Sequence, residues 1–198
     1  MSLSCSRGPA ARGLVLIVLA ALGLSTAPAA GAAPAQAASQ APPGPGTYTV
    51  SALHSGKCLG PRDASDYAQI VQQPCDGRAS QRVTLVPATG YRPNTFRFKL
   101  DSGMCWEVHN DDKDPYTPIV QRPCRSGWYQ WFDLHDDWHP WAGSVIRTNT
   151  GGWTDRDRWR VLHVHNASVA DNTHLIQYAP HNWHGTGARN DTFLFHPA

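Results

Sequence analysis

Short apolar runs alternate with turn residues from about residue 47 to the end of the chain. No segment keeps the 3.6-residue period of an amphipathic helix, and Gly, Pro, Asn and Asp interrupt the sequence every few residues. Short apolar runs bounded by turn residues are typical of β-strands. The expected strands include residues 48–50, 69–72, 83–86, 96–100, 119–121, 132–134, 145–147, 159–162, 175–178 and 193–195. The pattern therefore predicts an all-β domain of many short strands.

The same motifs recur along this domain at matching spacing. The sequence IVQRPC at 119–124 has an upstream counterpart, IVQQPC, at 70–75. The pair CWEVHN and TPIVQ, which begins at Cys105, has a downstream counterpart in VLHVHN and THLIQ, which begins at Val161. Matches at several offsets in register indicate internal repeats. We therefore predict three repeats, at about 47–90, 91–140 and 141–198.

Residues 1–37 have the pattern of a secretory signal peptide. Arg7 and Arg12 precede an apolar core at 13–24, and Ala-x-Ala cleavage sites follow it. The core is shorter than the roughly 20 residues that a membrane-spanning helix needs, which argues against a membrane anchor. Residues 38–46 are rich in Ala and Pro and are expected to form a disordered tether. We therefore predict a secreted, extracellular protein whose folded domain covers 47–198.

Removal of the leader changes the charge balance. The whole chain holds 17 Lys and Arg against 15 Asp and Glu, and the leader contains Arg7 and Arg12 but no acidic residue. The remaining chain is therefore neutral before histidine is counted. Nucleic acids and anionic membranes both require a cationic face on their partner. We expect neither of these partners, and we expect a monomer.

The cysteine pattern predicts two disulfides. One of the five cysteines, Cys5, lies in the leader, so an even number remains in the folded domain. In an exported protein such cysteines form disulfides. Four cysteines permit three pairings, and the equivalence of the repeats selects the one in which each repeat closes on itself. The expected disulfides are Cys58–Cys75 and Cys105–Cys124, whereas the third repeat has Val161 and Pro180 at these positions.

The repeated motifs resemble those of the ricin B-chain type lectin repeat, with its Gln-x-Trp signature. They comprise Ser-Gly-x-Cys at 55–58 and 102–105, Ile-x-Gln-x-Pro-Cys at 70–75 and 119–124, Gln-x-aromatic at 130–132 and its degenerate counterparts at 81–83 and 191–193. The resemblance covers about 47–198. It implies a β-trefoil of three four-stranded repeats, in which six strands close a barrel and six strands cap it. It also implies that Val83, Phe132 and Phe193 belong to the core.

The resemblance also implies what a sugar pocket requires from one repeat. In this family an acid stands two residues after the first Cys position, an aromatic stands just before Pro-Cys, and an Asn precedes the Gln of the signature. The chemistry is general, because a sugar ring packs its C–H face on an aromatic ring while its hydroxyls seek charged or polar partners.

The third repeat is the best candidate under this pattern. It has the aromatic, Tyr178, and the Asn, Asn190, which Asp191 follows. Its acid position is occupied by His163, which can still exchange hydrogen bonds with a hydroxyl. A longer loop at 179–189 carries Trp183, a candidate second stacking face; a loop tryptophan that only covers the barrel is the alternative.

The second repeat keeps an acid, Glu107, but departs elsewhere from the pattern. Arg122 stands at the stacking position and Tyr129 at the Asn position. Glu107 is therefore a further candidate ligand-binding residue. The alternative is that Glu107 and Arg122 form a salt bridge that closes the pocket.

The first repeat has none of the three residues that the pattern requires. Gly60, Gln73 and Ser80 stand at the acid, aromatic and Asn positions. Asp63 or Asp66, in the loop that follows, are the only candidates to replace the acid. We therefore do not expect this repeat to bind sugar.

Other chemistry finds little support in the sequence. His163 and His165 would point to opposite faces of a strand, and no acid or thiolate accompanies His181 and His184, so we expect no metal. No nucleophile motif and no cofactor motif is present, and we expect no enzyme activity and no cofactor. The sequence predicts a secreted, stand-alone module that binds glycans or polysaccharide through partly degenerate sites. The alternative is a trefoil without sugar binding that acts as a protein-interaction or inhibitor module; a small glycosidase is a third hypothesis.

Overall fold

The computed structural model describes residues 43–135, 143–150, 159–180 and 189–198, all within one compact unit, Ala37–Ala198. The predicted signal peptide and most of the predicted tether lie outside these residues. Within the described ranges, no helix is long and apolar enough to cross a membrane. The strands are β1 (Gly46–Ala52), β2 (Cys58–Pro61), β3 (Ile70–Gln73), β4 (Arg82–Pro87), β5 (Thr95–Leu100), β6 (Met104–Val108), β7 (Ile119–Pro123), β8 (Phe132–His135), β9 (Ser144–Thr148), β10 (Arg160–Val164), β11 (Leu175–Tyr178) and β12 (Thr192–Pro197).

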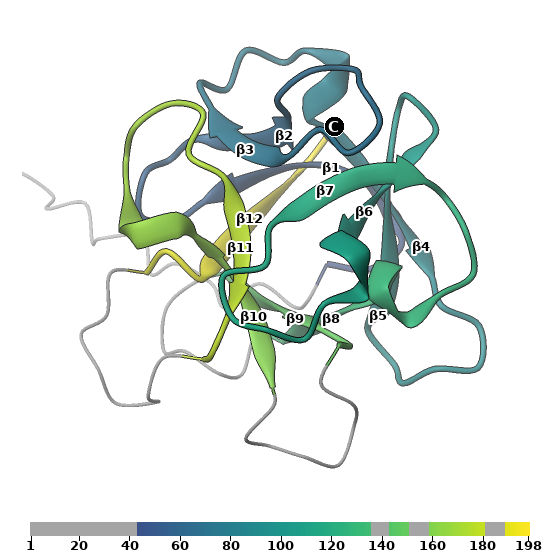
Figure 1. Cartoon of the computed structure of the whole chain (residues 1–198). Coiled ribbons are helices and arrows are strands. Elements are labelled where there is room, and N and C mark those ends of the chain that lie inside the picture. Colours follow the sequence, from purple (N-terminus) through teal and green to yellow (C-terminus); the bar gives the residue numbers. More distant parts are fainter. Residues whose placement is uncertain (1–42, 136–142, 151–158, 181–188) are drawn as a thin grey trace, which may run out of the picture. The chain divides into compact units, whose positions relative to one another are not determined.

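Strand pairing closes a barrel and adds three hairpins to it. The barrel runs β1–β4–β5–β8–β9–β12 and returns to β1, with every pair antiparallel. The hairpins are β2–β3, β6–β7 and β10–β11 (Figure 1). Each repeat thus supplies two barrel strands on either side of one hairpin. This is the β-trefoil topology, so the predicted fold is confirmed.

The barrel encloses an aromatic and aliphatic core. Val83, Phe132 and Phe193 are fully buried, which confirms their predicted place in the core. The ring of Phe98 stacks on Trp106 with centroids 5.0 Å apart and meets Phe132 edge-on at 5.3 Å. Side chains on successive strand positions alternate between the core and the outside, so the predicted short apolar runs supply every second residue to this core.

Two disulfides close the hairpins of the first two repeats. Cys58 bonds to Cys75 and Cys105 bonds to Cys124, with Cα atoms 4.9 and 5.0 Å apart. Both predicted pairings are confirmed. In the third repeat, Val161 packs without exposure at the position of the first cysteine, so packing alone closes that hairpin.

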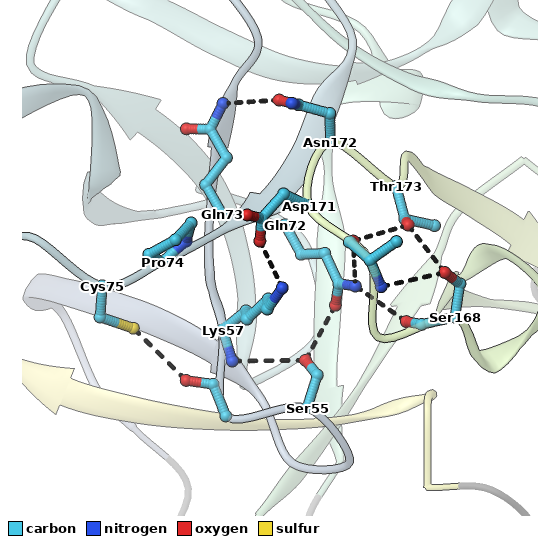
Figure 2. A network of polar contacts seen from close by, with 12 residues as sticks. Ser55, Lys57, Gln72, Gln73, Pro74, Cys75, Ser168, Asp171, Asn172 and Thr173 are labelled. Atoms are coloured by element: carbon cyan, nitrogen blue, oxygen red, sulfur yellow. Dashed lines mark hydrogen bonds and ion pairs between the residues drawn. The ribbon is translucent and has the colours of Figure 1, made fainter.

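Three buried glutamines join each repeat to a neighbouring repeat. The side-chain Nε2 atoms of Gln72, Gln121 and Gln177 each donate to two carbonyl oxygens in a loop of a neighbouring repeat. The acceptor pairs are Ser168 and Ala170 for Gln72, Asp63 and Ser65 for Gln121, and Asp112 and Asp114 for Gln177. Figure 2 shows the first set, in which Gln72 reaches across to the third repeat. We call these three sets the glutamine clamps.

Candidate functional site

A cleft of about 190 Å³ lies between the third repeat and a loop of the second. Strands β10 and β11 form one wall of the cleft. Its lining consists of Tyr116, His163, Asn166, Ala167, Ile176, Tyr178 and Asn190. Three of the predicted site residues, His163, Tyr178 and Asn190, are therefore brought together in one place.

The pairing of β10 with β11 explains why His163 and Tyr178 meet. His163 stands opposite Ile176, and Tyr178 is two residues further along the same strand. Residues two apart on a strand project from the same face, so all three side chains lie on the cleft side. The ring of Tyr178 meets the buried ring of His163 edge-on, with centroids 5.6 Å apart.

A short 3-10 helix, η5 (His165–Ala167), brings Asn166 to the cleft directly after β10. Asn166 and Ala167 have φ values of 53° and 50°, in the left-handed region. Asn tolerates this region through its short polar side chain, whereas Ala adopts it at a cost. Because Asn110 and Asp111 repeat this geometry in the second repeat, the turn is a feature of the fold that the third repeat uses to place Asn166.

Asn190 is buried at the inner side of the cleft. Its Nδ2 donates to the backbone carbonyl oxygen of Val164 at 2.7 Å, and the backbone carbonyl oxygen of Asn190 accepts from the Val164 amide at 2.8 Å. These bonds fix the side chain against the end of β10. The buried Oδ1 has no hydrogen-bond partner within the described part of the chain.

Tyr116 comes from the second repeat and was not predicted from the sequence. Its hydroxyl donates to the hydroxyl of Tyr178 at 3.3 Å, and the two ring centroids are 4.8 Å apart. This hydrogen bond raises the pKa of Tyr116 above its ordinary value, so the phenol stays neutral at physiological pH. The sequence signal was weak but present, since Tyr67 and Tyr116 both precede the repeated Gln by the same spacing.

In the second repeat, the polar residues at the corresponding positions bond to each other. Glu107 is buried, and its carboxylate accepts from Arg125 at 2.8 Å and from Nε2 of Gln130 at 2.8 Å. The alternative that paired Glu107 with Arg122 is wrong. Arg122 instead lies over the ring of Tyr67, 3.6 Å from its centroid, and pairs with Asp66 at 3.4 Å.

The first repeat is closed by close backbone packing. A Cβ added at Gly60 would lie 2.8 Å from the carbonyl oxygen of Ser80, so no acidic side chain fits at this position. At the stacking position, Gln73 donates to the side chain of Asn172 at 3.1 Å (Figure 2). The two candidate acids are engaged elsewhere: Asp63 accepts from the Ser65 amide at 2.8 Å, and Asp66 pairs with Arg122.

Asp191 and Trp183 are the remaining predicted site residues. Asp191 is buried and does not line the cleft. Trp183, His181 and His184 lie outside the described residues. Among the residues that the structure does describe, no group of three His, Cys, Asp or Glu side chains is close enough to hold a metal ion.

A six-stranded barrel capped by three hairpins defines a β-trefoil. Residues 35–122 match the model of the family described as "Ricin-type beta-trefoil lectin domain-like". This match agrees with the resemblance that the motifs predicted. No curated protein matches the chain in sequence.

Several solved structures share this fold. The designed threefold symmetric protein ThreeFoil is 24% identical, with a TM-score of 0.65 over 77% of this chain and 99% of that chain. The Rhizoctonia solani agglutinin is 18% identical, with a TM-score of 0.59 over 78% of this chain and 96% of its own. A Polyporus squamosus lectin, bound to a human-type influenza-binding epitope, is 11% identical, with a TM-score of 0.58 over 77% of this chain and 49% of its own. At these identities the likeness defines the fold alone.

Proposed function

We propose that this protein binds carbohydrate in the cleft of its third repeat. The observation that carries the proposal is the position of Tyr178, a partly buried aromatic ring on the wall of an open cleft. Such a ring offers an apolar face to the C–H face of a sugar. The domain family and the glycan-bound lectin among the structures with this fold support the same conclusion.

The polar groups around Tyr178 match the hydroxyl rim of a sugar. Asn166 and Asn190 supply amide groups, and His163 can donate or accept depending on its tautomer. The Oδ1 atom of Asn190 is a buried acceptor, and a sugar hydroxyl is a suitable donor to it. A cleft of about 190 Å³ is smaller than the roughly 300–1,000 Å³ pockets of drug-sized ligands. Its size therefore suits one sugar ring at the end or side of a glycan.

The other two repeats act as structural units in this proposal. The Glu107–Arg125 pair occupies the second repeat, and the contact between Gly60 and Ser80 closes the first. One site, rather than three, then accounts for binding. Two disulfides also favour a protein that works in an oxidising, extracellular setting.

A glycan array tests this proposal directly. The purified protein is incubated with immobilised mono-, oligo- and polysaccharides, alongside the variants Tyr178→Ala and Arg122→Ala. Arg122 is the counterpart of Tyr178 in the second repeat, because each stands at the same position of its hairpin. We expect retention of the wild type and of Arg122→Ala, and a loss of at least about tenfold in affinity for Tyr178→Ala.

Other outcomes would point to other functions. If no glycan retains the wild type, the proposal fails and a protein partner becomes the better hypothesis. Hydrolysis of a glycan by the purified protein would contradict a purely binding role.

A further inference from the structure

We propose that the sugar site belongs to two repeats, with Gln177 as the positioning residue that holds Tyr116 in its wall. This inference rests on the proposed function and adds a specificity-determining residue to the same cleft. Tyr116 lies in the second repeat, whereas Tyr178, His163 and Asn190 lie in the third. The site is therefore complete only when the two repeats are held together.

The side-chain amide of Gln177 is fixed at both of its ends. Its Nε2 donates to the carbonyl oxygens of Asp112 and Asp114 at 2.8 and 2.9 Å, which ties down the loop that leads to Tyr116. Its Oε1 accepts from the hydroxyls of Thr148 and Thr150 at 3.1 and 2.8 Å. The two threonine bonds are buried and lie in a low-dielectric interior, whereas the bonds to Asp112 and Asp114 are partly buried.

The backbone of Gln177 completes the clamp. Its carbonyl oxygen accepts from the amide of Tyr116 at 2.8 Å, and its amide donates to the carbonyl oxygen of Thr117 at 2.9 Å. Tyr178 directly follows Gln177 along β11. Gln177, which holds Tyr116, is therefore the chain neighbour of Tyr178, whose ring Tyr116 contacts. Any shift of the clamped loop changes the separation of the two tyrosine rings.

Tyr116 needs this restraint because its backbone is strained. Its φ of 70° lies in the left-handed region, which is unfavourable for a bulky aromatic residue. Its side chain is 55% exposed, so burial of the ring does not hold it in place. Such conformations persist where the surroundings impose them. The Gln177 clamp imposes the positive φ of Tyr116.

A glutamine clamp of the same kind holds the loop of the first repeat that carries Tyr67. Gln121 clamps the loop that carries Tyr67, which also has a positive φ, of 65°, and is 45% exposed. Tyr67 contacts Arg122 at the position where Tyr116 contacts Tyr178. Gln121 and Tyr67 therefore serve as controls for Gln177 and Tyr116. The Nε2 bonds to two loop carbonyls are equivalent, whereas Gln177 also accepts from two threonine hydroxyls at Oε1.

The experiment compares Gln177→Met with Gln121→Met, and Tyr116→Ala with Tyr67→Ala. Affinity is measured by titration with the best-retained oligosaccharide of the array, and melting temperature is measured on the same samples. We expect both glutamine variants to lose thermal stability, and Gln177→Met to lose more because it also removes the acceptor of the Thr148 and Thr150 hydroxyls. Only Gln177→Met should also lose affinity, by about tenfold at temperatures where both variants are folded. Tyr116→Ala should weaken binding about fivefold or more and Tyr67→Ala should leave it unchanged.

Several results would overturn the inference. Equal affinity of Gln177→Met and Gln121→Met would show that the clamp serves the fold alone. If Gln177→Met fails to fold, the affinities of Tyr116→Ala and Tyr67→Ala provide the test. Unchanged binding by Tyr116→Ala would then contradict a site shared by two repeats. Both outcomes differ from failure of the proposed function, in which the wild type itself binds none of the oligosaccharides.

Discussion

Arg125 and Glu107 form an ion pair in the second repeat, with Nη2 of the arginine 2.8 Å from Oε1 of the glutamate. The carboxylate also accepts from Gln130, the glutamine of the Gln-x-aromatic motif. The acid that a sugar pocket needs is thus committed to internal partners. In the second repeat, which best preserves the motifs of the family, Glu107, Arg125 and Gln130 therefore stabilise the fold.

Replacement of Arg125 by Met should destabilise the protein without affecting glycan binding. The variant leaves the buried carboxylate of Glu107 without its charged partner, which should lower the free energy of unfolding by about 1.5–3 kcal/mol. Arg78→Met is the control, since Arg78 pairs with Asp76 at the surface, where such pairs contribute little to stability. Denaturant unfolding of both variants checks this. Equal losses would mean that the Glu107 pair behaves like a surface pair.

An ion pair with both partners buried lies between β8 and β9 and should be more sensitive to substitution. Asp133 and Arg147 are both buried, and Nε of the arginine donates to the carboxylate at 3.0 Å. Arg147→Met would leave the buried carboxylate of Asp133 without its charged partner, with a loss of about 3–5 kcal/mol in unfolding free energy. The double variant Asp133→Asn/Arg147→Met should recover part of this loss. A double variant as unstable as the single one would contradict the ion-pair explanation.

Stability should fall on mild acidification because of His174. Burial lowers the pKa of His174, and the positive charge that His165 and Arg62 can place nearby lowers it further. The rings of His174 and His165 stack with centroids 4.7 Å apart. A lowered folded-state pKa gives stability that is present above the unfolded value of about 6.5 and is lost as pH falls through the folded value.

The corresponding measurement is the melting temperature between pH 7 and pH 5. We expect the wild type to lose stability over this window, and we expect His174→Asn to show a shallower slope. Identical slopes would exclude His174 as the source of the pH dependence.

Removal of either disulfide should lower the stability of the repeat that contains it. The bonded cysteines are separated by 17 and 19 residues, and loops of this size are worth about 3 kcal/mol in the chain-entropy model. The variants Cys58→Ser/Cys75→Ser and Cys105→Ser/Cys124→Ser should each lose about this much in denaturant unfolding. A loss well below 1 kcal/mol would mean that packing alone closes these hairpins, as it does in the third repeat.

Much of the fold could be predicted from the sequence because the repeats supply the information three times. The short apolar runs predicted ten of the twelve described strands and missed β2 and β6. The equivalence of the repeats predicted both disulfides. The resemblance to the ricin B-chain type lectin repeat implied that His163, Tyr178 and Asn190 would meet in the third repeat. Each of these relationships lies within one repeat, where strand register and loop length limit the geometry.

Relationships between repeats were harder to predict. The repeated glutamine at Gln72, Gln121 and Gln177 was visible as a pattern, but its bonds to the preceding repeat depend on how the three hairpins meet. Tyr116 entered the cleft for the same reason. Glu107 has two arginines within reach along the chain, and only the course of the loop after β7 decides that Arg125 is its partner.

The central claim is that the cleft of the third repeat is the sugar site. The most direct test is NMR titration of ¹⁵N-labelled protein with the best-retained oligosaccharide of the array. The account predicts saturable shifts of the backbone amides of Asn166, Tyr178 and Asn190, and smaller changes around Gln73 and Arg122. Shifts centred on the first or second repeat, or saturable binding that leaves the third repeat unchanged, would contradict it.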